Sequence, residues 1–174
     1  MLFSKETLEE ALRALVEELV ADEAEAKIQI VGAAAVTLQV GRESLTRDID
    51  ALGSSTPAVR AAAIRIAESR NWPETWINDA VKMYMTHHDT DDDWELRVEE
   101  QRVVILVARP ELLLAMKLLA GRGRRDGEDI ERLLHACAVT SLGQAQEIFD
   151  RYFPTEVIAA PALAQLQARF SRSV

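Results

Sequence analysis

The sequence predicts an α/β fold of the α+β type, in which helices flank a mixed sheet and a C-terminal helical layer follows. Helical and strand-like periodicities alternate along the first 108 residues, as is typical of a sheet with helices packed on it. From residue 109 onward the periodicity is helical. Hydrophobic residues make up 48% of the 174 residues, enough to bury a sizeable core. We therefore expect an α/β core with an N-terminal helix over residues 1–108, and a helical subdomain packed on it over residues 109–174.

The composition narrows the class of protein. A formal net charge of −9 disfavours broad, sequence-independent binding to nucleic acid. Cys137 is the one cysteine, which excludes an intrachain disulfide framework and a cysteine metal cluster; we expect a buried thiol there rather than a nucleophile. Apolar runs stay shorter than the roughly 20 residues needed to span a bilayer, and the start does not resemble a signal peptide. We expect a cytoplasmic protein without a membrane partner.

The first three elements are a helix, a strand and a second helix. Leucines at helical spacing predict a helix over residues 5–21, with Ser4 as its cap. A short strand over residues 27–31 runs into Gly32, which opens a helix of small residues that ends at Gly41. A strand, a glycine turn and a helix N-terminus place backbone N–H groups where an anion can bind. Small residues also serve close packing of a helix on a sheet, so both interpretations stay open.

The next predicted strand, residues 46–52, carries two carboxylates. Alternate side chains of a strand share a face, so Asp48 and Asp50 would point the same way with Cα atoms roughly 6–7 Å apart, while Ile49 points to the other face. Two converging carboxylates can hold a hard divalent cation, most often Mg²⁺ with phosphate oxygens completing its shell. The alternative is a solvated acidic turn at a strand end.

A helix and two strands complete the predicted core. Thr56 as cap and Pro57 as first residue predict a helix that ends near Arg70. Two apolar, partly alternating stretches, 94–98 and 101–107, are typical of strands.

The stretch between that helix and those strands is less regular. We expect a short helical turn over residues 76–81, and Met83 and Met85 as fillers of the core. Residues 86–93 contain two histidines and four aspartates, but without a regular ligand spacing. An acidic loop is favoured there over a metal site.

The C-terminal region begins with a strongly apolar helix from residues 109–111 onward, in which Lys117 is the only cation. A lysine in such a helix needs water or a partner for its amine, so it either snorkels to the surface or has a functional role. After the basic turn 121–125, Asp126 opens the next helix, and it can be the N-cap, a functional residue or both. Further amphipathic helices are expected over residues 141–152 and about 162–170.

Two separated blocks of sequence resemble one family. Residues 31–35 (Val-Gly-Ala-Ala-Ala), Gly41-Arg42 and 46–50 (Thr-Arg-Asp-Ile-Asp) resemble the Gly-Gly…Gly-x-x-Arg-x-Thr-x-Asp-Ile-Asp signature of minimal nucleotidyltransferases. Residues 113–120 and 125–130 are similar to the Leu-Ala-x-Lys-Leu and Arg-x-Lys-Asp-x-x-Asp regions of the AbiEii/MenT-type toxins of bacterial toxin–antitoxin systems. The resemblance covers roughly residues 27–134.

This resemblance implies a DNA polymerase β-like nucleotidyltransferase fold and a set of site residues. It implies Asp48 and Asp50 as catalytic metal ligands for Mg²⁺ or Mn²⁺, and Lys117 as a contact to nucleotide phosphate or to the aspartates. It also implies that Asp126 orients Lys117 or the basic turn. The remaining nucleotide-binding positions that it implies are Gly32, Ala33, Thr46 and Arg47.

The chain departs from the signature in three ways. Ala33 replaces the second glycine of the pair, Arg42 and Thr46 are spaced with an extra residue relative to the commonest pattern, and the third acidic ligand that is usual for this fold is not evident. Glu95 and Glu99 are candidates for that ligand by their order along the chain.

The function that the resemblance implies is metal-dependent transfer of a nucleoside monophosphate from a nucleoside triphosphate to an RNA or protein acceptor. It further implies a component of a toxin–antitoxin system with an antitoxin protein as partner. The alternative is a nucleotidyltransferase-like binding or interaction module whose catalysis is impaired. A purely structural role of both aspartates is the third hypothesis.

Overall fold

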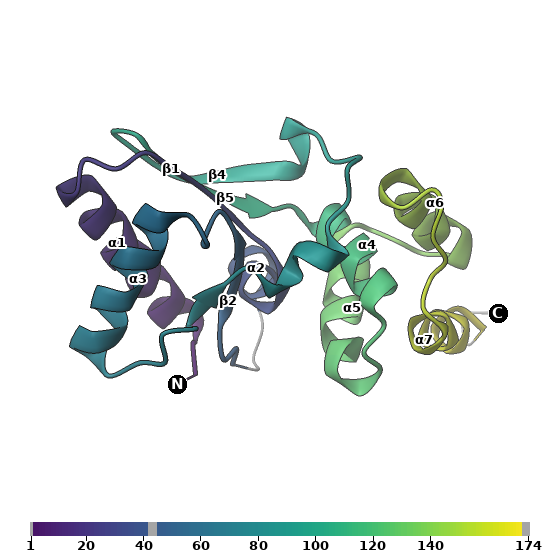
Figure 1. Ribbon diagram of the computed structural model, residues 1–174. Coiled ribbons are helices and arrows are strands. Elements are labelled where there is room, and N and C mark those ends of the chain that lie inside the picture. Colours follow the sequence, from purple (N-terminus) through teal and green to yellow (C-terminus); the bar gives the residue numbers. More distant parts are fainter. Residues whose placement is uncertain (1, 42–44, 172–174) are drawn as a thin grey trace. The chain divides into compact units, whose positions relative to one another are not determined.

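The structure is a computed structural model that describes residues 2–41 and 45–171; Arg42 of the signature lies outside the described residues. Its fold is mixed α/β, as predicted (Figure 1). The helices are α1 (Lys5–Ala21), α2 (Gly32–Val40), α3 (Pro57–Arg70), α4 (Pro110–Ala120), α5 (Arg124–Ala136), α6 (Leu142–Tyr152) and α7 (Ala160–Phe170). The strands are β1 (Ala26–Ile30), β2 (Ile49–Leu52), β3 (Ile77–Asn78), β4 (Trp94–Glu100) and β5 (Val103–Ala108), and two short 3-10 helices are η1 (Ala80–Tyr84) and η2 (Asp91–Asp93).

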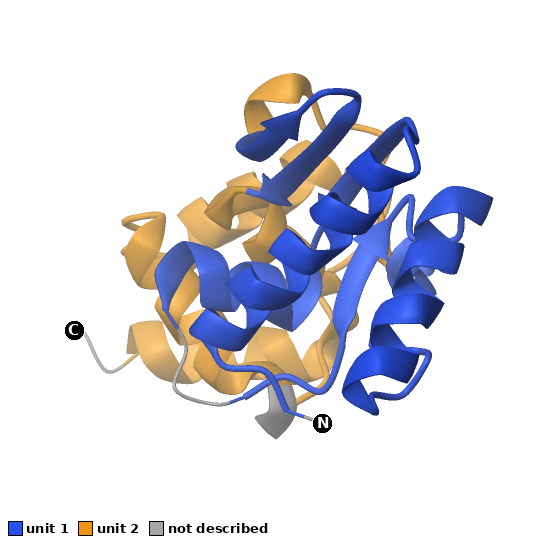
Figure 2. Cartoon of the chain, turned by 90° about the vertical axis from the view of Figure 1, so that its left-hand side faces the viewer, with its two compact units in different colours: residues 1–83, 94–108 blue, residues 84–93, 109–174 orange. Residues whose placement is uncertain are grey.

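The chain divides into two compact units, coloured separately in Figure 2. The first comprises Met1–Met83 and Trp94–Ala108, and the second comprises Tyr84–Asp93 and Arg109–Val174. Residues 84–93, which the sequence predicts to be part of the core, belong to the second unit. The reason is a set of hydrogen bonds: the Arg109 amide donates to the Asp93 carbonyl at 2.8 Å, and the Tyr152 hydroxyl donates to the Asp93 carboxylate at 2.5 Å.

The first unit is built on one five-stranded sheet with the order β3-β2-β1-β5-β4. β1 pairs with β5 in parallel and with β2 antiparallel, β2 pairs with β3 in parallel, and β4 with β5 antiparallel. Helix α2 contacts β2 and β5, and α1 packs against α3 (Figure 1). Alternation along β2 buries Ile49 and Ala51 completely, so the half-buried Asp50 belongs to the other face of the sheet.

The second unit is helical, and α4 is its centre. Helix α4 contacts α5, α6 and α7, because five consecutive residues, Leu112–Met116, are buried around its axis. Within the described residues, none of the helices combines the length and the apolar character that crossing a bilayer requires.

Several predicted boundaries are confirmed, because local signals set them. Ser4 caps α1 by accepting a hydrogen bond from the Thr7 amide, and α2 runs from Gly32 to Val40. Helix α3 ends at Arg70, followed by Asn71 as C-cap in the left-handed conformation. Thr56 is the N-cap of α3 as expected, although its hydroxyl donates to the Gly53 carbonyl instead of accepting from the helix.

Other predictions are wrong. The turn expected over residues 76–81 is strand β3 followed by η1, because Ile77 and Asn78 pair with Ile49 and Asp50. Met83 is not a core residue, since it is 78% exposed. The predicted strand 46–52 begins only at Ile49, which leaves Asp48 in a bend before β2.

Candidate functional site

The turn from β1 into α2 brings a backbone amide, a glycine and a carboxylate together. The Val31 amide donates to the Asp50 carbonyl at 2.9 Å, which ties the end of β1 to the start of β2. Gly32 has φ +65°, a conformation that glycine adopts without strain. A β-carbon on Gly32 would stand 2.5 Å from Oδ2 of Asp50. The Asp50 carboxylate therefore lies directly against Gly32, at the N-terminus of α2.

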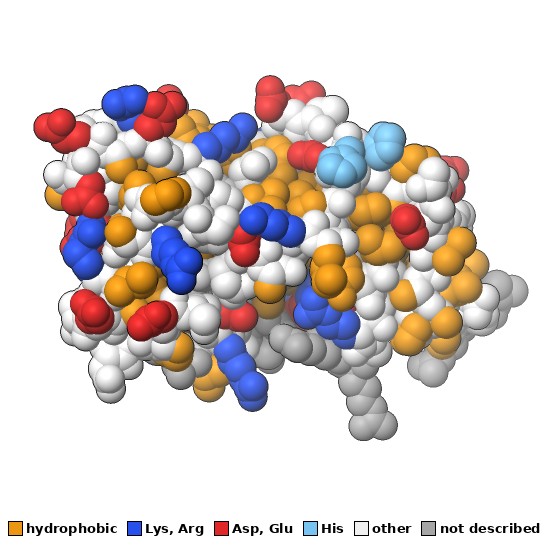
Figure 3. Space-filling view, in the orientation of Figure 1, with side chains coloured by type: hydrophobic (Ala, Val, Ile, Leu, Met, Phe, Trp, Pro, Cys, Tyr) orange, Lys and Arg blue, Asp and Glu red, His pale blue; other side chains and the backbone are white. Residues whose placement is uncertain are grey.

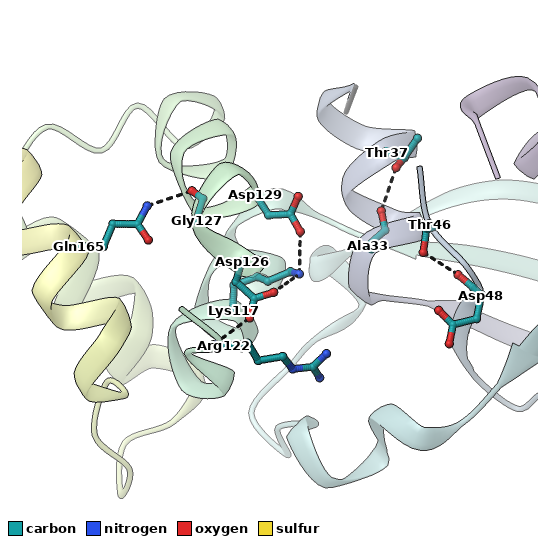
Figure 4. A network of polar contacts seen from close by, with 10 residues as sticks. All are labelled: Ala33, Thr37, Thr46, Asp48, Lys117, Arg122, Asp126, Gly127, Asp129 and Gln165. Carbon is teal, nitrogen blue, oxygen red and sulfur yellow. Dashed lines mark hydrogen bonds and ion pairs between the residues drawn. The ribbon is translucent and has the colours of Figure 1, made fainter. Parts of the chain in front are cut away.

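That N-terminus is suited to an anion. The first amides of a helix have no acceptor inside the helix, and the valine at the N-cap, Val31, carries no polar side-chain atom that could cap them. Ala33 takes part in the first turn, where its carbonyl accepts a hydrogen bond from the Thr37 hydroxyl at 3.0 Å (Figure 4). A negative group at this end of α2 would meet backbone N–H donors and the positive end of the helix dipole.

Asn78, which no sequence pattern singled out as a site residue, neighbours both Asp48 and Asp50. Asn78 pairs directly with Asp50 in the parallel strands β2 and β3, so their side chains share a face about 4.8 Å apart. The Asn78 amide Nδ2 donates to Oδ2 of Asp48 at 3.4 Å. Both carboxylates thus neighbour Asn78. Strand alternation was expected to bring Asp48 and Asp50 to one face, but Asp48 lies outside the strand. The parallel pairing that reveals Asn78 has no local signal in the sequence.

Glu95 and Glu99 do not complete this cluster. Both lie on β4, which the strand order separates from β2 by β1 and β5. Three strand spacings amount to about 14 Å, which is too far for either carboxylate to share a cation with Asp50. Among the residues that the structure describes, there is no group of three or more His, Cys, Asp or Glu side chains that could hold a metal ion.

The donor set at β2 nevertheless has the chemistry of a hard-cation site. The two carboxylates are oxygen ligands, which Mg²⁺ and Mn²⁺ prefer, while Asn78 directs its amide nitrogen at Asp48 and accepts a hydrogen bond from the Ala80 amide at its Oδ1. Mg²⁺ is usually bound by one or two carboxylates and completes its shell with water and substrate phosphates. The residues present therefore fit a divalent cation bound together with a phosphate. They supply two carboxylate charges, where the usual site of this fold supplies three.

The two neighbours Thr46 and Arg47 take different positions. Thr46 is buried, and its hydroxyl donates to the Asp48 carbonyl at 3.0 Å (Figure 4). Its side chain therefore binds the backbone of the chain beside Asp48. Arg47 is exposed to solvent.

A second polar cluster lies within the helical unit. The Lys117 ammonium lies 2.7 Å from Oδ1 of Asp126 and 2.7 Å from Oδ2 of Asp129 (Figure 4). The side chains of Lys117, Asp126 and Asp129 are 12%, 2% and 0% exposed. The snorkelling alternative for Lys117 is therefore wrong, since its amine is held by buried carboxylates instead of by water. The role of Asp129 was not anticipated from the sequence.

Asp126 is not the N-cap of α5. The N-cap is Gly123, and Asp126 is the third residue of the helix. Its Oδ2 accepts a hydrogen bond from the Arg122 amide at 3.0 Å, while Oδ1 accepts from Lys117. One carboxylate therefore joins α4, the basic turn and α5. The Arg122 guanidinium in turn lies 5.3 Å from the centroid of the Tyr84 ring, in a cation–π contact.

Comparison with known proteins identifies one family. Residues 7–152 match the family described as "Nucleotidyltransferase of unknown function (DUF6036)". No curated protein and no solved structure matches the chain.

Proposed function

The chain belongs to this nucleotidyltransferase family, and on that premise we propose that it transfers a nucleoside monophosphate from a nucleoside triphosphate to an RNA or protein acceptor. The observation that carries the proposal is the contact of Asp50 with Gly32, beside Asp48 and Asn78. Carboxylates that bind a cation and backbone amides that bind phosphate are the two requirements for holding a metal–triphosphate complex.

Each residue has a proposed role. Asp48 and Asp50 would hold Mg²⁺ or Mn²⁺, and Asn78 would orient Asp48. Gly32 would let the backbone approach the phosphates, and the amides at Ala33 would bind them. When bound, the cation would neutralise the triphosphate and stabilise the leaving pyrophosphate.

The second cluster has a separate proposed role. Two of the three N–H donors of the Lys117 ammonium are directed at Asp126 and Asp129. We propose that the third donates to a nucleotide phosphate and that the two carboxylates orient it. Thr46 and Arg47 were also expected to bind nucleotide. The bond of Thr46 to the backbone favours a structural role for it.

The first experiment is a thermal shift with Mg²⁺ and each of the four nucleoside triphosphates. A ligand at a hundred times its Kd stabilises by about 2.7 kcal/mol, which raises the Tm of a chain of this size by several degrees. Asp48→Asn with Asp50→Asn should abolish the shift. Glu95→Gln with Glu99→Gln removes the same charge from β4 and should leave it unchanged. A wild-type protein that no nucleotide stabilises would contradict the proposal.

A second candidate function is nucleotide or partner binding without turnover. It is favoured by the neutral Asn78 beside Asp50, because a site with two carboxylates holds a cation less strongly than one with three. Label transfer from a radioactive nucleoside triphosphate to RNA or protein separates the two candidates. Labelled product that depends on Asp50 establishes catalysis, whereas nucleotide binding without labelled product establishes the binding module.

The acceptor and the biological setting are further parts of the proposal. On the face shown in Figure 3, Lys and Arg side chains lie scattered among acidic ones, which favours neither RNA nor protein as acceptor. We propose that the chain is the toxin of a toxin–antitoxin pair, as the likeness to AbiEii/MenT-type toxins implies. Expression should then arrest growth, and Asp48→Asn with Asp50→Asn should relieve the arrest. Unimpaired growth with active protein would contradict the toxin role.

A further inference from the structure

Asp48 lies outside the ladder of the sheet, so something other than strand pairing has to hold it. β2 begins at Ile49, and residues 47 and 48 form a bend. The Asn78 amide donates to the Asp48 carboxylate, while backbone hydrogen bonds hold the stretch on either side of Asp48. Those bonds lead, on both sides of Asp48, to the same group of aromatic residues.

On the N-terminal side, the holding residue is Thr46. It forms an isolated antiparallel bridge with Phe3, in which the Phe3 amide donates to the Thr46 carbonyl at 2.7 Å and the Thr46 amide donates to the Phe3 carbonyl at 3.2 Å. The Thr46 hydroxyl then donates to the Asp48 carbonyl at 3.0 Å. The position of Asp48 is thereby tied to Phe3 through one intervening residue.

On the C-terminal side, the Ile49 amide donates to the Trp76 carbonyl at 2.8 Å. Trp76 is itself fixed, because it is buried and its indole N–H donates to the Ala63 carbonyl at 3.0 Å. The residue after Asp48 is therefore anchored to helix α3 through a tryptophan.

Phe3 and Trp76 belong to one packed cluster with Trp72. The ring centroids of Phe3 and Trp72 are 5.3 Å apart, those of Trp72 and Trp76 are 5.4 Å apart, and those of Phe3 and Trp76 are 6.2 Å apart. The first two pairs are edge-to-face, a favourable arrangement of aromatic rings. Phe3 is fully buried and directly precedes Ser4, the cap of α1. The cluster thus joins α1, α3 and the two flanks of Asp48.

We propose that Phe3 is a positioning residue, and that the cluster of Phe3, Trp72 and Trp76 holds the Asp48 carboxylate in place for a divalent cation. This inference rests on the proposed function, since it assigns the cation to Asp48. The geometry of a ligand set decides affinity, because Mg²⁺ requires near-ideal octahedral coordination. Loss of the Phe3 ring would leave the backbone bridge from residue 3 to Thr46 without its packed anchor, and Asp48 would then sample positions that do not bind.

The test compares Phe3→Ala and Phe3→Leu with Leu15→Ala, a fully buried position of α1. Both alanine variants leave a cavity and lower stability to a similar degree, but Leu15 makes none of the bonds that flank Asp48. Mn²⁺ affinity is measured by calorimetry at a temperature where each variant is folded. We expect the Kd to rise at least tenfold in Phe3→Ala, to stay near wild type in Leu15→Ala, and to recover partly in Phe3→Leu.

Hydrogen exchange of the Thr46 and Ile49 amides gives a readout without metal. Exchange should accelerate in Phe3→Ala and stay slow in Leu15→Ala. Unchanged exchange and Mn²⁺ affinity in both Phe3 variants would overturn the positioning role while the metal site stands. So would an equal loss of affinity in Leu15→Ala. A wild-type protein that binds no Mn²⁺, and that Asp48→Asn does not change, would instead overturn the proposed function, and the positioning role with it.

Discussion

Oδ2 of Asp50 lies 2.5 Å from the point where a β-carbon on Gly32 would stand, so the candidate metal ligand occupies the space that only a glycine leaves open. Gly32→Ala meets two obstacles, the clash with Asp50 and the left-handed conformation at φ +65°. The conformation alone costs about 1–2 kcal/mol in a non-glycine residue. Because the clash adds to this cost, we expect Gly32→Ala to lose more unfolding free energy in urea than the conformation alone explains. We also expect it to lose Mn²⁺ binding in calorimetry.

Gly41, at the other end of α2, is the matched control. It has φ +68°, but a β-carbon there would have no atom of the described residues within 4 Å. Gly41→Ala should therefore carry only the conformational cost and should bind Mn²⁺ like wild type. Equal behaviour of the two variants would show that the closeness of Asp50 to Gly32 has no consequence.

Asn78→Asp should lower the stability of the protein without a divalent cation and raise it with one. Without a divalent cation, a third carboxylate beside Asp48 and Asp50 adds repulsion, which we expect to lower the unfolding free energy by about 1 kcal/mol and Tm by about 2–4 °C. With saturating Mn²⁺, the added charge strengthens binding and Tm should exceed that of wild type. The measurement is a melting curve with EDTA and with Mn²⁺. A variant destabilised equally in both conditions would show that Asn78 is not beside a cation site.

Lys117→Met should be strongly destabilising, because it leaves Asp126 and Asp129 buried without their cation. Removing one partner of a buried ion pair costs about 3–5 kcal/mol. Adding Asp129→Asn should recover part of that loss in urea unfolding, since it removes one of the two buried negative charges. A Lys117→Met variant with the wild-type urea midpoint would mean that water, not Lys117, balances the carboxylates.

The thiol of Cys137 should be unreactive in the folded protein. Burial and, to a smaller extent, the charge of Glu111 raise the pKa of Cys137 from 9.0 to about 12. Because a thiolate is the reactive form, labelling by a thiol reagent at pH 8 should be slow in buffer and rapid in urea. The folded state holds its proton more tightly, so its stability advantage is complete below pH 9 and is lost as pH rises from 9 to 12. Cys137 is half-buried, and rapid stoichiometric labelling in buffer would contradict that shielding of the thiol.

Elements that local chemistry defines could be predicted from the sequence. Periodic leucines and the Ser4 cap specify α1, and the glycine before a run of small residues specifies the turn from β1 into α2. The burial of Ile49 and the opposite face of Asp50 follow from alternation in β2. These signals lie within one helix turn or one strand, so they need no knowledge of a distant partner.

What the tertiary structure alone decided are relationships between distant segments. The sequence pointed to Asp48 and Asp50 as a pair, but strand alternation was the wrong reason for Asp48, which is held in a bend between Thr46 and Ile49. Asn78 joins the site through parallel pairing of β3 with β2, and the sheet order removes Glu95 and Glu99 from it. Lys117 has its charge balanced by Asp126 and Asp129 on another helix. Such contacts depend on which segments meet across the fold, and a local pattern of residues does not encode that choice.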